Sequence, residues 1–272
     1  MNKYELTSEI LQYAGHTLHR IRALKNFGPV KVGERGGWIE KEGNLSQVND
    51  AWVCGYAKVY DNAVVYGDAM VCGIAIVGGD AKVCGNSKVC GNAMVWGDAI
   101  VCGDAKVYGD AMVCGDAIVC GDAVVYDNAK VYGNAKVCGN SKVGGDAEVY
   151  GDAGVGGDAE VYGDAGVGGD SKVGGNAKVG GNAKVYGKAE IGGNAKVRDQ
   201  ADYIVFKNFW SSGRYFTWTR SNNKWRVGCF SGTGKELIKK AYADSDLSGR
   251  EYERVVRYVE SILADEKKEK SN

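Results

Sequence analysis

One six-residue unit fills most of this 272-residue chain and restricts the folds open to it. From Val53 to Val197 a Val stands at every sixth position, with Ile191 as the only substitution, so the unit G-[DN]-A-x-V-y runs 25 times without an insertion. The Gly position departs only to Asp61 and Asp127. Because side chains alternate along a strand, Ala and Val share one face while x and y share the other. We therefore expect each A-x-V-y segment to be a short strand with its small residues inward, and each Gly-Asp or Gly-Asn pair to be a corner.

Three such corners would close a triangular coil of 18 residues, and outward side chains 18 apart should then stack in columns. The cysteines follow this spacing, since seven of the eight in the repeat fall into two series: Cys54, Cys72 and Cys90, and Cys84, Cys102, Cys120 and Cys138. A solenoid of this kind is stabilised by its backbone ladder and by contacts between neighbouring coils, so its open ends need caps.

The unit resembles the hexapeptide repeat of left-handed β-helix proteins. Together with LHRIRAL at 18–24, GGWIE at 36–40 and NLS at 44–46, it resembles bacterial and phage β-solenoid proteins often labelled as acetyltransferases. The resemblance implies a mainly β fold, a single-stranded parallel left-handed β-helix. At 18 residues a coil, the repeat has room for about 8 coils, a rod on the order of 40 Å long.

The repeat divides the chain into an N-terminal cap at 1–50, the solenoid at 51–199 and an α+β module at 200–272. Segment 17–24 should be a strand of the cap. In the module we expect strands at 203–206, 215–220 and 224–229, the last two forming a β-hairpin, and two helices. The helices should begin at the capping boxes Thr233–Glu236 and Ser248–Glu251, and the charged tail from Asp265 should fray.

The balance of 34 basic and 34 acidic residues requires neither nucleic acid nor an anionic membrane as partner. No signal peptide and no apolar stretch of membrane-spanning length is present, which favours a cytoplasmic protein with no membrane contact, in the host cytoplasm if a phage encodes it. The cysteines lack a C-x-x-C pattern, so we expect cytosolic free thiols and no metal.

The histidines argue against an enzyme. Left-handed β-helix acyltransferases use a histidine base, yet only His16 and His19 are present and both precede the repeat. We expect no catalytic residues and no cofactor, with a CoA-dependent acyltransferase that uses an atypical base as the alternative. A cap role for segment 1–50 is favoured over a ligand site at Trp38 and Glu40, and turn capping is favoured over calcium at the Asp corners because Asn replaces Asp freely.

Apolar side chains gather at outward positions of the first half of the repeat. An apolar stripe on a solvated rod indicates a contact surface, and the expected partner is another copy, in a dimer or trimer. The alternative is that the C-terminal helices fold back over it. The predicted oligomer interface consists of Met70, Ile76, Met94, Trp96, Ile100, Met112 and Ile118.

Basic and aromatic residues interleave in the C-terminal module, which resembles a module beside solenoid repeats in phage proteins. The predicted partner-binding residues are Arg214, Trp218, Arg220, Lys224, Trp225 and Arg226. They would suit a host protein, nucleic acid or a nucleotide, although the aromatics could instead form a small core with a charged rim. The sequence thus predicts a non-catalytic scaffold that self-associates and presents this module. The alternative is a phage-encoded inhibitor or sponge of host defence.

Overall fold

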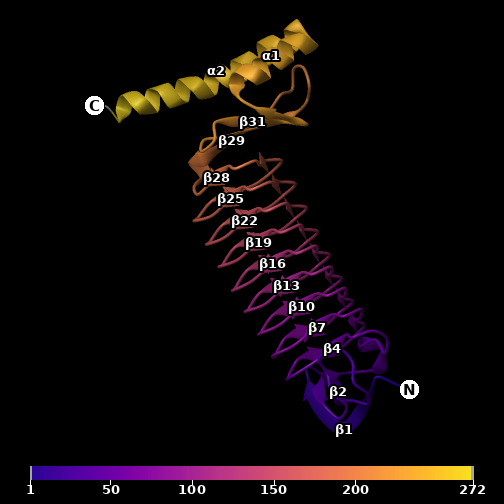
Figure 1. Cartoon of the computed structure of the whole chain (residues 1–272). Helices are drawn as coiled ribbons and strands as arrows, with labels where there is room; N and C mark the ends of the chain where they lie inside the picture. Colours follow the sequence, from indigo (N-terminus) through magenta and orange to yellow (C-terminus); the bar gives the residue numbers. More distant parts are fainter. Residues whose placement is uncertain (1, 271–272) are drawn as a thin grey trace.

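The computed structural model describes residues 2–270 and shows a rod of stacked coils with a cap at each end (Figure 1). The rod is a parallel β-solenoid of about nine turns, against the expected 8. Each coil has 18 residues, because Met94 pairs in parallel with both Ile76 and Met112. The Ala and Val side chains of the repeat point inward and are buried. The predicted coil and its inward residues are therefore confirmed.

The coils form three parallel sheets, which we name after one outward residue of each. The Ile76 face contains β5 (Lys58–Val59), β8 (Ile76–Val77), β11 (Met94–Val95), β14 (Met112–Val113), β17 (Lys130–Val131), β20 (Glu148–Val149), β23 (Gly166–Val167) and β26 (Lys184–Val185). The Met70 face contains β4 (Trp52–Val53), β7 (Met70–Val71), β10 (Lys88–Val89), β13 (Lys106–Val107), β16 (Val124–Val125), β19 (Lys142–Val143), β22 (Glu160–Val161), β25 (Lys178–Val179) and β28 (Lys196–Val197). The Ile100 face contains β6 (Val64–Val65), β9 (Lys82–Val83), β12 (Ile100–Val101), β15 (Ile118–Val119), β18 (Lys136–Val137), β21 (Gly154–Val155), β24 (Lys172–Val173) and β27 (Glu190–Ile191).

The corners explain the Gly-[DN] pair. The corner glycines adopt positive φ, as at Gly103 (71°), where residues with a Cβ are strained. The Asp or Asn that follows links coil to coil, since the Asn62 amide donates to the Asp80 carboxylate at 3.0 Å. The same bond between residues 18 apart recurs at Asn86–Asp104, Asn92–Asp110, Asn128–Asp146, Asn134–Asp152 and Asn140–Asp158.

The prediction that all cysteines are free thiols was wrong for four of them. Cys54 is bonded to Cys72 and Cys120 to Cys138, each pair 18 residues apart. The physical reason is the coil itself, which places their Cα atoms 4.8 and 4.7 Å apart, within the range a disulfide bridges.

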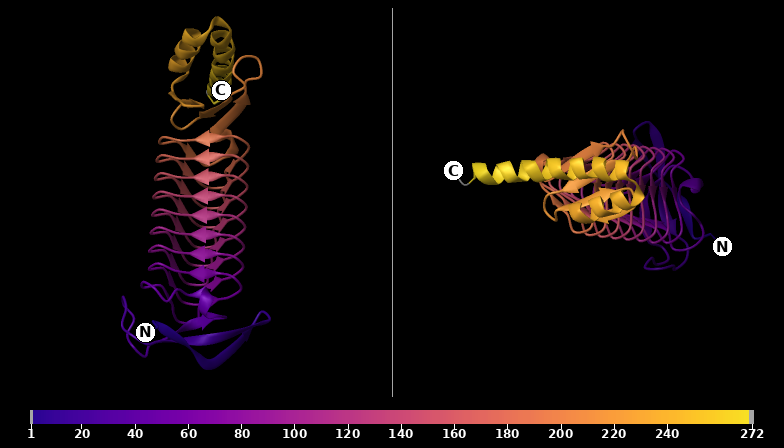
Figure 2. Two further views of the ribbon diagram at one scale, coloured as in Figure 1. Left: turned by 90° about the vertical axis from the view of Figure 1, so that its right-hand side faces the viewer. Right: turned by 90° about the horizontal axis from the view of Figure 1, so that it is seen from above.

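The N-terminal cap extends the sheet of the Ile76 face. Strands β1 (Tyr4–Tyr13) and β2 (His16–Ala23) form an antiparallel hairpin, and β3 (Arg35–Ile39) joins it to β5 in parallel. The short 3₁₀ helix η1 (Glu42–Asn44) follows. Indigo strands close one end of the rod in Figure 2, so the expected cap strand at 17–24 is part of a three-stranded lid.

The C-terminal module closes the other end of the rod. After η2 (Gln200–Asp202), strands β29 (Tyr203–Lys207), β30 (Tyr215–Thr219), β31 (Lys224–Val227) and β32 (Phe230–Gly232) form an antiparallel sheet, so the predicted hairpin is the centre of four strands. Side chains of the module bond the exposed backbone of the last coils: Thr217 and Ser221 accept from Glu190 and Lys196 N–H groups, and Tyr203 donates to the Lys184 carbonyl.

Helices α1 (Gly234–Asp244) and α2 (Asp246–Glu269) lie across this end of the rod (Figure 2). They are far from the apolar first half, so the alternative that they fold back over it is wrong. The Thr233–Glu236 capping box is confirmed. The Ser248–Glu251 box is wrong, because Ser245 caps α2 one turn earlier and its hydroxyl accepts from the Ser248 N–H.

The predicted fraying from Asp265 is also wrong as far as the structure describes the tail, because α2 continues to Glu269. Arg220, the residue after β30, donates two hydrogen bonds of 2.6 and 2.9 Å to the Glu266 carboxylate. These bonds fix the last turns of α2. The final two residues of the predicted tail lie outside the described residues. In the described part of the chain, neither α1 nor α2 has the length and apolar character needed to cross a bilayer.

Candidate functional site

The predicted oligomer interface is distributed over all three faces of the rod. Ile76, Met94 and Met112 lie in one column of the Ile76 face, with Trp96 beside them. Met70 lies on the Met70 face, and Ile100 and Ile118 pair on the Ile100 face. A single flat partner could therefore contact only one of these groups.

The Ile76 face carries the longest apolar column. Its three apolar side chains follow one another in adjacent coils, between Lys58 on one side and Lys130 on the other. The column of the Ile100 face has two, Ile100 and Ile118, before Lys136 follows. On the Met70 face, Met70 is followed directly by Lys88.

Aromatic side chains extend this column toward the N-terminal cap. Trp96 packs over Gly78, whose missing side chain leaves room for the indole ring, and reaches Tyr60 two coils away with ring centroids 5.4 Å apart. Tyr13 of β1 and His16 of β2 also contact the Tyr60 ring. Trp96 is 39% exposed, which is unusual for so large an apolar group on a solvated surface. We call Ile76, Met94, Trp96 and Met112 the apolar column; Tyr60 is buried and supports it from the cap side.

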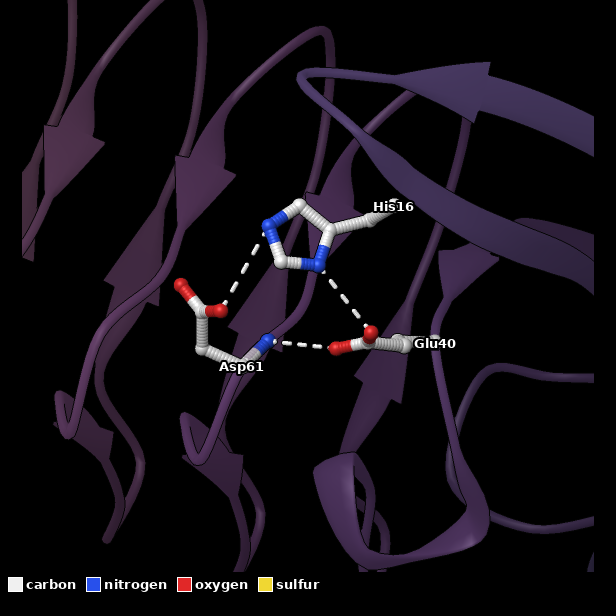
Figure 3. A group of neighbouring side chains, drawn as sticks. All are labelled: His16, Glu40 and Asp61. Atoms are coloured by element: carbon white, nitrogen blue, oxygen red, sulfur yellow. Dashed lines mark hydrogen bonds and ion pairs between the residues drawn. The ribbon is translucent and has the colours of Figure 1, made fainter.

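A histidine held between two carboxylates marks the cap end of the column (Figure 3). His16 Nδ1 lies 3.0 Å from Glu40 Oε1, and its Nε2 lies 3.5 Å from Asp61 Oδ1. Each carboxylate is fixed by a backbone N–H at its other oxygen: Asp61 N–H donates to Glu40 at 2.7 Å, and Gly79 N–H donates to Asp61 at 3.1 Å. Asp61 takes the corner position with φ of 56°, a strained conformation that its two contacts offset.

The arrangement is a histidine bridge between two carboxylates and not a converging set of metal ligands. The ligand atoms of His16, Glu40 and Asp61 lie within 4.8 Å of one another, and such a donor set could bind a divalent cation. However, the two ring nitrogens point to opposite carboxylates, as Figure 3 shows, so the ring bridges them instead of converging with both on one point. The hydrogen bond from His16 lowers the pKa of Glu40, while burial raises the pKa of Tyr60 to about 12. The cluster therefore joins the cap hairpin to the first coils.

We expect His16→Gln to weaken the acid sensitivity of the cap. Because the folded pKa of Glu40 lies below its unfolded value of 4.5, this interaction contributes stability above pH 4.5 and loses it as the pH falls through the folded pKa. The site is partly exposed, so the contribution should be about 1 kcal/mol or less. Urea unfolding between about pH 3 and pH 7 measures it. His19→Gln is the matched control, because His19 lies on the same strand and its ring nitrogen bonds the Thr7 carbonyl at 3.3 Å instead of a carboxylate; equal slopes in both variants would contradict this role.

The predicted partner-binding residues lie in different environments in the structure: some are buried, some contact other parts of the chain, and some are exposed. Trp218 and Trp225 are 1% and 2% exposed in the core of the module, so they cannot stack on a ligand. Arg220 is engaged by Glu266, and Arg226 packs over Gly192 at the end of the solenoid. The remaining members, Arg214 and Lys224, are exposed. The aromatics thus form the small core with a charged rim that the sequence left as the alternative.

The module has a cleft whose lining contains none of the predicted partner-binding residues. It has a volume of about 530 Å³ and lies between the end of β29 and α2. Trp210, which is 73% exposed, and Tyr258, which is 55% exposed, stand at its rim. Its lining consists of Phe206, Lys207, Asn208, Trp210, Glu251, Arg254, Val255 and Tyr258.

Sequence reasoning missed the association of His16 with Asp61. The sequence contains two signals: Asp61 is one of two departures from Gly in the repeat, and Glu40 is a candidate ligand residue in the cap. Their meeting depends on how the cap hairpin docks, which no periodicity encodes. Trp38 does not join the cluster but lies under Arg20, 5.0 Å from ring centroid to guanidinium carbon.

Comparison with known families agrees with the fold. The profile of the YdcK β-solenoid repeat matches residues 57–73 and 105–121, both within the coils. A comparison with curated proteins gave no match. These findings identify a β-solenoid repeat and leave the activity to be argued from the surface.

Proposed function

We propose that this β-solenoid repeat protein is a non-catalytic scaffold that associates with itself through the apolar column and presents its C-terminal module at the far end of the rod. The observation that carries the proposal is the in-register run of Ile76, Met94 and Met112 beside the exposed Trp96. A second copy placed side by side would cover these groups.

The energetics favour burial of this column. Ile76, Met94 and Met112 are already partly buried, so covering the rest of each contributes only part of the roughly 1.5–3 kcal/mol that complete burial of such a side chain provides. Large aromatic residues such as Trp96 dominate the stability of interfaces. Lys58 and Lys130 flank the run and can remain solvated at the rim of the contact. Parallel strands also keep the column straight, so one face can contact another along several coils.

The module is placed to contact a further partner. Its sheet uses one end to cap the solenoid, while the cleft at Trp210 and Tyr258 stays open. Arg254 of the cleft is paired with Glu251 at 2.7 Å, so the lining is mainly an apolar and aromatic surface beside Lys207, which suits a segment of a partner protein that carries an aromatic residue. An inhibitor of a host protein would use the same cleft.

The self-association is tested by Met94→Glu with Met112→Glu. These residues are adjacent in the column, so the double change places two charges at the centre of the contact, where they would be desolvated. We expect the mass in solution to fall to that of the single chain, 28.9 kDa, as measured by light scattering.

The matched control is Lys88→Glu with Lys106→Glu, which occupies equivalent positions in adjacent coils of the Met70 face. This control should leave the mass unchanged. Circular dichroism of all variants verifies that the solenoid is intact. An unchanged mass for the methionine variant, or an equal fall in both, would remove the Ile76 face as the interface.

A further inference from the structure

A second column, on the Ile100 face, consists of four cysteines in four consecutive coils. Cys84, Cys102, Cys120 and Cys138 occupy the same position of the repeat, and the N–H of each donates to the next coil at 2.9 to 3.0 Å. Cys120 and Cys138 form a disulfide, whereas Cys84 and Cys102 are free. All four are only partly buried. The column therefore contains a disulfide with two thiols in line beside it.

The spacing allows a disulfide at any of three positions. The Cα atoms of Cys120 and Cys138 are 4.7 Å apart. Because every coil follows the same register, Cys102 has equivalent neighbours in Cys84 and Cys120. Disulfides bridge Cα separations of about 4.4–6.8 Å. The chain needs no change of backbone to replace one pairing by another.

The end of the column at Cys138 opens on a shallow hollow of about 360 Å³. Gly154 and Gly156 form its floor, and a Cβ added at Gly154 would meet nothing within 4 Å. Lys136 and Lys172 border the hollow, and Asp152 is the acidic group among its lining residues. A small anionic molecule could thus approach the Cys138 sulfur.

We propose that this column is a thiol–disulfide exchange site that reacts with small anionic thiols and disulfides at Cys138 and passes the disulfide toward Cys84. The Cys102 thiolate attacks the Cys120 sulfur, the Cys102–Cys120 bond forms, the Cys120–Cys138 bond breaks, and Cys138 leaves as a thiolate that takes up a proton. The attack is in line because the three sulfurs belong to the same position in consecutive coils.

A second exchange moves the disulfide to the far end. The Cys84 thiolate attacks Cys102, forms the Cys84–Cys102 bond and releases Cys120. Cys120 and Cys138 can then be reoxidised by a small disulfide RSSR, which is reduced to two RSH molecules as the protein disulfide forms. The full column therefore holds two disulfides. Burial and the adjacent Cys84 raise the pKa of the Cys102 thiol, so exchange should be faster at alkaline pH.

The migration is tested on the full chain, reduced and then oxidised with one equivalent of oxidised glutathione. After incubation without further oxidant, the sample is quenched with acid and cleaved before Asp residues. Peptide 80–97 contains both Cys84 and Cys90, so the column is studied in a Cys90→Ser background; there the Cys84 peptide and the Cys138 peptide, 127–145, differ in sequence, while Cys102 and Cys120 lie in identical DAIVCG peptides. Each of the three pairings thus has its own mass. We expect all three to appear while the number of free thiols stays constant.

The control variant is Cys102→Ser, in which Cys120–Cys138 should be the only pairing within the column. A chain with all four column cysteines that retains only Cys120–Cys138 over the same incubation would overturn the migration. Lys136→Glu with Lys172→Glu should slow oxidation by glutathione disulfide several-fold and leave oxidation by neutral hydroxyethyl disulfide unchanged. An unchanged rate with glutathione disulfide, or the same slowing with both oxidants, would overturn the hollow as the entry site.

Discussion

Deleting three residues from the repeat should strongly destabilise the rod, whereas deleting eighteen should leave a stable rod one coil shorter. Removal of 146–148 joins Gly145 to Val149 and shifts every later unit by half a hexapeptide. Strands would then face corners in the next coil, and inward residues would no longer stack. To restore the six-residue register, the chain would have to expel three further residues as a loop, at the cost of one strand with its backbone hydrogen bonds and of moving every later unit to the next face of the rod.

Removal of 146–163 instead joins Gly145 to Asp164 and preserves the unit G-D-A. In the intact chain Glu148 pairs with both Lys130 of β17 and Gly166 of β23. After the deletion Lys130 pairs directly with Gly166. We expect cooperative unfolding in this variant and a length reduced by about 5 Å, measured by small-angle X-ray scattering. Equal stability of the two deletions would show that the chain does not depend on an 18-residue register.

Gly103→Val should destabilise the solenoid by about 3 kcal/mol. Gly103 has φ of 71°, a conformation that a β-branched residue rarely adopts. An added Cβ would also lie 3.0 Å from the backbone nitrogen and oxygen of Gly121 in the next coil. The backbone there is held on both sides and cannot move away.

Gly103→Asn is the control for this substitution. Asn tolerates positive φ better than Val does, and Asp61 and Asp127 already occupy equivalent corners with φ of 56°. We expect a loss of about 1 kcal/mol for Asn. Thermal and urea unfolding followed by circular dichroism measure both variants, and equal losses would show that backbone strain does not decide the corner residue.

The repeat made the solenoid predictable, because the same unit, with small inward residues and a glycine corner, recurs 25 times. The period of Val fixed the coil, and the cysteine spacing fixed which side chains stack, as the Cys120–Cys138 bond illustrates. That two cysteine pairs would be bonded did not follow from composition, since the expectation of free thiols rested on compartment instead of distance. Local signals such as the Thr233 capping box were equally readable.

The ends of the chain were less predictable because they depend on single long-range contacts. Ser245 and Ser248 both suit a helix start, and only the packing of α2 on α1 selects Ser245. Trp218 and Trp225 alternate with basic residues in the sequence, which suggested a binding surface, yet they pair across β30 and β31 and face the helices. The His16 cluster joins residues 24 and 45 positions apart through the docking of a hairpin.

The central claim is that a second copy lies against the Ile76 face. Photo-crosslinking tests it most directly, with p-benzoylphenylalanine in place of Met94 and, as a reference, in place of Lys106 on the Met70 face. The account predicts a covalent dimer only from position 94, with the crosslink in a peptide of the partner that carries Ile76, Trp96 or Met112. A chain that remains at 28.9 kDa from both positions, or crosslinks equally from position 106, would contradict it.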